Sequence, residues 1–191
     1  MIYLKNEIFY SYYEFDKILD EELVISLFVL FNKYYPSYKI IHADFNDIEE
    51  VLKWEDFILN DYKIISKHDM SIWLDVPFCL LKEDTISLPK ALRRGVSFFY
   101  GLEEDGTRNA VGINFYGNVY TNIRHDFDPE NRVYVPVDQS ACAKKNREIM
   151  TAFLKELEIL LEGEITEFLS PFYLDEKYIF KYGIKSDAVL K

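Results

Sequence analysis

Apolar residues recur at the spacing of an α-helix over residues 20–36. Asp20 is a favourable N-cap, and the acidic Glu21 and Glu22 suit the first turn of a helix. Pro36 ends the segment, because the residue before a proline is pushed out of helical geometry. The apolar positions that repeat are Leu23, Leu27, Leu30, Phe31 and Tyr34. The pattern therefore predicts a helix between Asp20 and Pro36.

A longer helical pattern begins at Asp138 or Ser140, either of which can cap it, and runs to Leu161. Gly163 then stands at a C-terminal cap position, where glycine is favoured. The apolar stripe of this helix consists of Cys142, Ile149, Phe153, Leu157 and Leu160. We expect this face to be buried against strands.

A third helix is predicted after Asn46, where Asn46 and Glu49 have the spacing of a capping box. Its apolar side carries Ile48, Val51, Leu52, Ile58 and Leu59, while the opposite side is acidic. Lys53 is the only positive charge on that opposite side, which otherwise presents Asp47, Glu49, Glu50 and Asp56.

Strand signals fill much of the remaining chain. Asp105-Gly106 and Gly117-Asn118 are two-residue hairpin signals, and Asp128-Pro129-Glu130-Asn131 predicts a further turn. They separate four runs that we expect to form one antiparallel meander: Val96–Glu103, Asn109–Tyr116, Val119–Phe127 and Arg132–Val137. Other predicted strands are Tyr38–His42, Ser71–Leu81 and, in the tail, Tyr178–Ile184. Residues 1–15 show no clean periodicity, and their structure stays open.

These elements predict a single α+β domain over residues 1–191. An antiparallel β-meander of about four to six strands is expected to pack against N-terminal helices and a long C-terminal helix. The hydrophobic fraction of 49% and the charged fraction of 29% are ordinary for a globular protein.

The cysteines and the N-terminus indicate a cytoplasmic protein. Cys79 and Cys142 lack the spacing of a redox or zinc motif, so we expect two free thiols in a reducing compartment. The N-terminus has no basic stretch followed by an apolar run, as a signal peptide would. The longest apolar segment, Leu23–Phe31, is too short to span a membrane. We therefore predict no membrane association.

Negative charge is concentrated at one end of the chain. The net charge is −11, and the first 60 residues contribute −7 of it, with 12 acidic and 5 basic side chains. Such a balance disfavours direct nucleic-acid binding through phosphates. It favours a basic protein partner, which an acidic surface attracts electrostatically. The candidate partner-binding residues are Asp44, Asp47, Glu49, Glu50, Trp54, Glu55 and Asp56. The alternative for these residues is an ordinary solvated helix face.

Metal and cofactor motifs are not evident, and we expect neither a metal nor a cofactor. Asp126 to Asn131 resembles the start of a calcium loop, but Asn131 stands where that loop needs glycine and Val137 where it needs glutamate. Glycine-rich phosphate loops and the zinc-binding H-E-x-x-H pattern do not occur. The protein is accordingly expected not to be an enzyme.

One catalytic alternative remains open. Cys142 falls in the first turn of the long helix, where the helix dipole lowers a thiol pKa, and His125 precedes it in the sequence. A Cys–His nucleophile would need the two groups in contact. Against it, Cys142 lies on the apolar stripe, where a thiol behaves as a small hydrophobe.

In size, acidity and layout the chain resembles the bacterial immunity proteins that neutralise toxins of competing bacteria. The resemblance implies a stoichiometric inhibitor that covers the active site of a basic toxin, for which a nuclease is the expected class. A phage-type anti-defence protein or DNA mimic is a further alternative. It would need acidic residues over most of the surface, whereas the C-terminal two-thirds of the chain is nearly balanced in charge.

Overall fold

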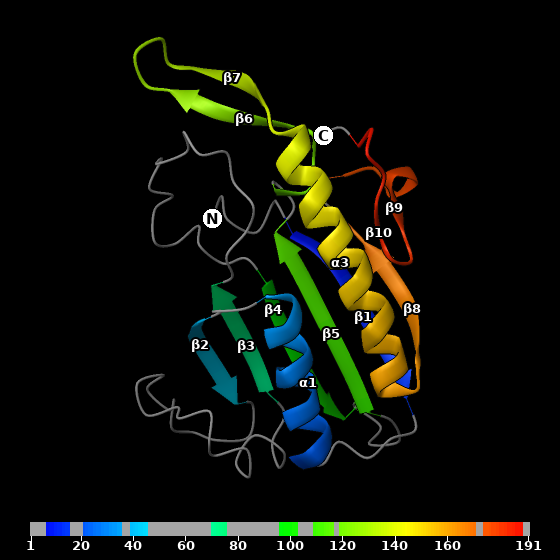
Figure 1. Cartoon of the computed structure of the whole chain (residues 1–191). Coiled ribbons are helices and arrows are strands. Elements are labelled where there is room, and N and C mark those ends of the chain that lie inside the picture. The colour runs from blue at the N-terminus through cyan, green and yellow to red at the C-terminus, as the bar shows by residue number, and fades with distance from the viewer. Residues whose placement is uncertain are drawn as a thin grey trace.

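The computed structural model in Figure 1 describes residues 7–15, 21–35, 39–45, 70–75, 96–102, 109–116, 119–170 and 174–188. Within these ranges two long helices accompany antiparallel strands, which confirms the predicted α+β class for this part of the chain. None of the helices described there is both long and apolar enough to cross a membrane. The helix predicted after Asn46 lies outside the described residues.

The main sheet is antiparallel throughout and has six strands among the described residues. Their order across the sheet is β2 (Lys39–Phe45), β3 (Met70–Asp75), β4 (Val96–Leu102), β5 (Asn109–Tyr116), β1 (Glu7–Phe15) and β8 (Glu164–Leu169). The side chains of Val111, Ile113 and Phe115 on β5 are buried. This central strand therefore supplies the floor of the core.

The meander prediction is wrong in its last two strands. β5 pairs with β1 on the side where the next strand of the meander was expected. Residues 119–122 form a turn, and β6 (Ile123–Asp128) and β7 (Val133–Asp138) make a two-stranded sheet of their own. The register of β1 shifts between Tyr10 and Tyr13, and such a bulge interrupts the two-residue alternation that identifies a strand in a sequence.

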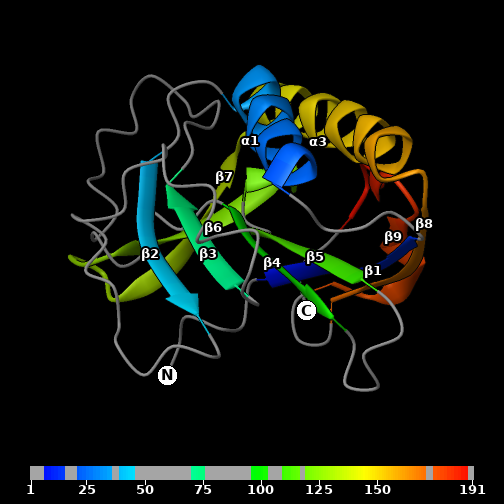
Figure 2. The same ribbon diagram turned by 90° about the horizontal axis from the view of Figure 1, so that it is seen from below.

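Helices α1 (Glu21–Tyr34) and α3 (Ser140–Leu161) lie side by side on one face of the main sheet, as Figure 2 shows. Phe153 of α3 is the junction. Its ring centroid lies 4.9 Å from that of Phe31, 5.6 Å from that of Tyr35 and 6.2 Å from that of Phe115. These edge-on aromatic contacts join both helices to β5, and each adds to the burial of apolar surface.

The buried face of α3 differs from the predicted stripe. Cys142, Phe153 and Leu157 are buried as expected, whereas Ile149 and Leu160 are only partly covered. The buried face is turned around the helix axis relative to the predicted stripe. It also includes Ala143, Asn146, Met150, Leu154 and Leu161. The apolar pattern of a helix predicts one buried stripe, but it does not show which residues beside that stripe the sheet and α1 will cover.

Both ends of α3 refine the predicted caps. The residue at the N-cap position is Gln139, but the Asp138 carboxylate accepts the Ser140 backbone N–H at 2.9 Å. At the other end Glu162, not Gly163, takes the left-handed conformation, with φ of 52°. The backbone N–H of Gly163 donates to the Glu158 carbonyl at 3.3 Å. Glycine thus follows the left-handed residue and does not form it.

The C-terminal part departs from the single strand predicted for it. It forms a short 3₁₀ helix, η5 (Glu176–Tyr178), and a small hairpin of β9 (Ile179–Phe180) and β10 (Gly183–Ile184). A Cβ on Gly183 would lie 3.0 Å from Thr151 Oγ1 on α3. The glycine therefore allows this C-terminal hairpin to approach the helix closely. Strand β8 was not predicted.

Glu158 joins α3 to β8 and to the C-terminal hairpin. Its carboxylate accepts hydrogen bonds from the Ile165 backbone N–H at 2.8 Å and from the Tyr182 hydroxyl, and it lies 2.9 Å from the Lys181 ammonium. Partial burial raises the pKa of Glu158, but the hydrogen bonds outweigh it and the net effect is a lowered pKa. The ionised form is therefore the one that the fold stabilises.

We predict that Glu158→Gln lowers the free energy of unfolding by about 1–3 kcal/mol at neutral pH, because it removes charge-assisted hydrogen bonds. The folded-state pKa is depressed, so this stabilisation is present above the unfolded pKa of about 4.3. It is lost as the pH falls through the lower folded value. Urea unfolding at several pH values measures the difference between the two proteins.

Glu148→Gln is the matched control for this prediction. Glu148 lies on the same helix, but its ion pair with Lys144, at 4.0 Å, joins two exposed side chains. Its replacement should change stability by less than about 0.5 kcal/mol. Equal effects of the two substitutions, or a Glu158 effect that persists unchanged in acid, would contradict the assignment.

Candidate functional site

Most of the predicted partner-binding residues fall outside the described ranges. Asp44 is the exception and lies on β2, which is an edge strand of the main sheet, where it pairs with Ser71. Asp47, Glu49, Glu50, Trp54, Glu55 and Asp56 are not among the residues that the structure describes. Their role as a binding surface stays a prediction.

The described residues offer a different candidate, the β6–β7 hairpin, which projects beyond the end of α3 (Figure 1). Tyr134 is 69% exposed, Val133 49% and Val135 38%, and Ile123 on β6 is 42% exposed. Successive residues of a strand face opposite sides. Tyr134 therefore points away from the side shared by Val133 and Val135, and both faces of the hairpin expose apolar surface.

The sequence of this hairpin is also acidic. Residues 123–138 contain four acidic side chains, Asp126, Asp128, Glu130 and Asp138, and two arginines, a net charge of −2. Proline on β7 at position 136 also keeps this strand at an edge, because it offers no backbone donor for a further strand. The hairpin thus combines exposed apolar side chains with a net negative charge.

The tip of the hairpin is a turn that Asp128 organises. The Asp128 carboxylate accepts the backbone N–H of Glu130 at 2.9 Å and that of Asn131 at 3.2 Å, and the Asn131 side-chain amide at 2.7 Å. These hydrogen bonds lower the pKa of Asp128. Arg132 completes the turn with a left-handed φ of 56°. The Asp128 oxygens, which lie within the segment that resembles the start of a calcium loop, serve this turn instead.

No cluster of three or more histidine, cysteine or acidic side chains that could hold a metal ion occurs within the described ranges. This observation covers only part of the chain, so it does not test the expectation that the protein has neither a metal nor a cofactor.

The hairpin is attached through a buried turn, residues Val119–Asn122, which we call the hairpin root. Thr121 of the root and Gln139 and Asn146 beside it are buried polar residues, each no more than 3% exposed. The Gln139 side-chain amide donates to the Thr121 carbonyl at 2.8 Å, and the Gln139 backbone N–H donates to the Asn122 carbonyl at 2.9 Å. The Asn146 side chain donates to the Val119 carbonyl at 2.9 Å.

Arg147 completes the set. Its guanidinium donates to the Tyr120 carbonyl at 2.5 Å and to the Asn122 side-chain oxygen at 3.0 Å. All four carbonyls of the root therefore accept a hydrogen bond from residues 139–147, at the start of α3. The Asn122 side chain in turn donates to the Ser186 carbonyl at 2.6 Å, which ties the root to the C-terminal segment.

This arrangement fixes the direction of a hairpin that has no place in the main sheet. A two-stranded hairpin alone is at best marginally stable in water. Here its base is held by hydrogen bonds that would be costly to leave unmade in a buried environment. A surface fixed in this way loses little entropy when it binds, and so suits recognition of a partner.

The two residues of the catalytic alternative, a Cys–His nucleophile, lie on different elements. Cys142 carries a thiol outside any disulfide and is 8% exposed, in the first turn of α3. His125 is exposed on β6, where it pairs with Pro136. Burial of the thiol disfavours a nucleophilic role, since a reactive cysteine needs access to its substrate. The Cys–His pair otherwise stays an untested alternative.

The sequence predicted the turn that joins β6 to β7, but it predicted neither their separation from the main sheet nor the root that holds them. One signal for the root was present. Asn146 lies four residues after Cys142 and four before Met150, and thus within an apolar helical row. An amide at a buried position requires a hydrogen-bond partner. Such a residue could have indicated that α3 packs against irregular backbone at this level.

Comparison of this chain with protein-family models, with curated proteins and with solved structures finds no match. Its function is therefore inferred from the hairpin, the root and the distribution of charge.

We predict that Asn146→Ala lowers the free energy of unfolding by about 1–3 kcal/mol, because it leaves the buried Val119 carbonyl without this donor. Amide hydrogens of residues 123–138 should also exchange faster, since the root that holds them is loosened. Urea unfolding and hydrogen exchange measure the two effects. Lys145→Ala, at the exposed neighbouring position, is the control and should leave both nearly unchanged.

Proposed function

We propose that this chain is a stoichiometric inhibitor that binds a basic protein toxin in the cytoplasm, with a nuclease as the expected class of toxin. The observation that carries the proposal is the β6–β7 hairpin, which holds exposed Val133, Tyr134 and Val135 on a fixed base. Exposed apolar side chains grouped in this way mark interaction surfaces.

The composition of the hairpin matches the organisation of a protein interface. Interfaces place aromatic and apolar residues at the centre and polar or charged residues at the rim. Tyr134 is the candidate anchor, since tyrosine is enriched among the residues that dominate binding energy. Val133 and Val135, on the opposite side of the strand, add apolar surface that a partner can cover.

Charge supports a basic partner. The chain carries −11 in total, with −7 in the first 60 residues and −2 in the hairpin region, residues 123–138. Charges of one sign accelerate encounter with a partner of the opposite sign, and the effect weakens as salt screens it. Blocking the active site of a basic enzyme requires binding alone, so the inhibitor needs no chemistry of its own.

We predict that the double variant Val133→Ser and Tyr134→Ala weakens binding to the partner by at least tenfold, mainly through faster dissociation. The matched control is Val29→Ser, because Val29 on α1 is also an exposed valine, at 65%. The partner is first isolated on the immobilised wild-type chain from the cells that express it and identified by mass spectrometry. Biolayer interferometry then compares the variants.

The proposal requires that the isolated protein be basic and that it lose its activity in proportion to the inhibitor added. An acidic partner, or a partner that stays fully active when saturated, would overturn inhibition of a basic toxin. Equal binding by the hairpin variant and the wild type would remove the hairpin from the interface.

A second prediction concerns the acidic residues of the N-terminal part. Replacement of Glu49, Glu50 and Asp56 by lysine should slow association with the partner by about tenfold or more at low salt, with a smaller effect on dissociation. Raising the salt concentration should slow association of the wild type. Stopped-flow fluorescence measures both rates.

The control variant replaces Glu162, Glu164 and Glu176, in the C-terminal part, by lysine. It changes the net charge by the same amount but leaves the predicted surface intact. If both triple variants slow association equally, net charge alone acts and the acidic residues have no local role. Indifference of the wild-type rate to salt would contradict electrostatic steering.

A further inference from the structure

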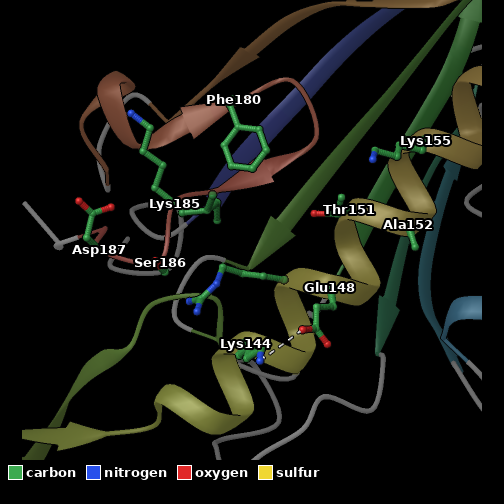
Figure 3. Close-up of a pocket in the computed structure, with 11 residues that line it drawn as sticks. Lys144, Glu148, Thr151, Ala152, Lys155, Phe180, Lys185, Ser186 and Asp187 are labelled. Carbon is green, nitrogen blue, oxygen red and sulfur yellow. Dashed lines mark ion pairs between the residues drawn. The ribbon is translucent and has the colours of Figure 1, made fainter.

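A hollow of about 770 Å³ lies between α3 and the C-terminal hairpin. It is separate from the β6–β7 hairpin, on which the proposed inhibitor function rests. Figure 3 shows Thr151, Ala152 and Lys155 on the helix side, with Phe180 and Ser186 across from them. A volume of this size is within the range of small-molecule binding sites. We call it the C-terminal hollow.

The hollow has an apolar base with an exposed aromatic ring. Ala152 of α3 and Ile184 of β10 face it from opposite elements, and Phe180 is 41% exposed at its side. Gly183 lets the Phe180 ring lie close to the backbone of its own hairpin, because a Cβ there would lie 3.3 Å from Phe180 Cζ. The phenyl ring is therefore placed over the hairpin backbone, with ring surface left for a ligand to stack on.

The charge of the hollow is opposite to that of the whole chain. Its lining contains four basic side chains, Lys144, Arg147, Lys155 and Lys185, and two acidic ones, Glu148 and Asp187, a net of +2. The chain carries −11. A positive hollow in a negative protein attracts small anions, while the net charge of the whole chain repels large polyanions.

The cations of the hollow are only lightly neutralised. The Lys144 ammonium is 4.0 Å from Glu148, and both side chains are more than half exposed, so their attraction is weak. The Lys155 ammonium lies 5.6 Å from the centroid of the Tyr182 ring. Within the described part of the chain, no carboxylate forms an ion pair with Lys155. A ligand anion could therefore pair with Lys155 without displacing a bound carboxylate.

We propose that the C-terminal hollow binds an aromatic organic anion, whose ring stacks on Phe180 and whose charged group pairs with Lys155 and its basic neighbours. Neither feature alone defines this class. A neutral aromatic compound would leave the cations without a partner, and a simple inorganic anion would leave the apolar base uncovered. Phosphate and carboxylate are both compatible as the charged group, so the experiment includes one aromatic compound of each kind.

The test titrates the full chain with adenosine monophosphate and with indole-3-acetate, followed by two-dimensional amide NMR and calorimetry. Adenosine provides the neutral aromatic comparison, and inorganic phosphate provides the anion without a ring. Binding of at least one aromatic anion with a dissociation constant below about 1 mM, with shifted amide signals in residues 151–155 and 180–186, supports the proposal. Preference for one probe identifies the charged group.

Two substitutions separate the contributions of ring and charge. Phe180→Leu retains an apolar side chain but removes the ring, and Lys155→Gln removes the charge, and each should weaken binding at least fivefold. Lys177→Gln is the matched control, because Lys177 also lies over a tyrosine ring, that of Tyr178 at 4.8 Å, but outside the hollow. It should leave the affinity unchanged, and thermal unfolding checks that all three variants fold.

The proposal is overturned if neither aromatic anion binds when its concentration is raised to 10-fold above about 1 mM. It is also overturned if adenosine or phosphate binds as tightly as the aromatic anions. It is also overturned if the shifted signals lie outside the hollow, or if Lys177→Gln weakens binding as much as Lys155→Gln. None of these outcomes depends on the protein partner, so the inhibitor function is tested separately.

Discussion

Four consecutive backbone carbonyls between Val119 and Asn122 determine how the C-terminal half of this protein is built. They follow the central strand β5 in a turn whose first three residues, Val119, Tyr120 and Thr121, are buried, so water has little access to hydrogen-bond with their backbone. Gln139, Asn146 and Arg147 at the start of α3 satisfy all four. A buried carbonyl without a donor costs free energy comparable to a lost hydrogen bond. The start of α3 and the direction of the β6–β7 hairpin are therefore fixed together.

The same residues connect two surfaces of opposite charge. Arg147 binds the root of the acidic hairpin and also lines the basic C-terminal hollow. Asn122 of the root reaches the carbonyl of Ser186, another residue of the hollow. Separation of charge on a protein of this size allows one surface to attract a basic protein while another attracts small anions. The aromatic junction at Phe153 keeps α3, on which both surfaces depend, in place on the sheet.

The sequence supports local predictions best where a single physical rule applies. The helix over Glu21–Tyr34 follows from a cap, an apolar repeat and a proline stop, and β5 from its flanking turn signals. The strand β1 shows the limit of such rules. Its bulge breaks the alternating pattern, and its partners β5 and β8 are distant in the sequence, so its existence depends on pairing that no local window contains. Asn146 shows a middle case, in which the residue type signals a buried partner but not which one.

What the sequence by itself determined is the α+β class, the periodic α1, the turn at Asp128 and the unequal distribution of charge, because each depends on residues close together in the chain. Only the tertiary structure decided that β1 takes the edge of β5 and thereby leaves β6 and β7 outside the main sheet. It alone brought α3 and the C-terminal hairpin together around a basic hollow. The reason is that sheet order and the burial of a polar residue depend on competition between distant segments for the same edge or the same interior space.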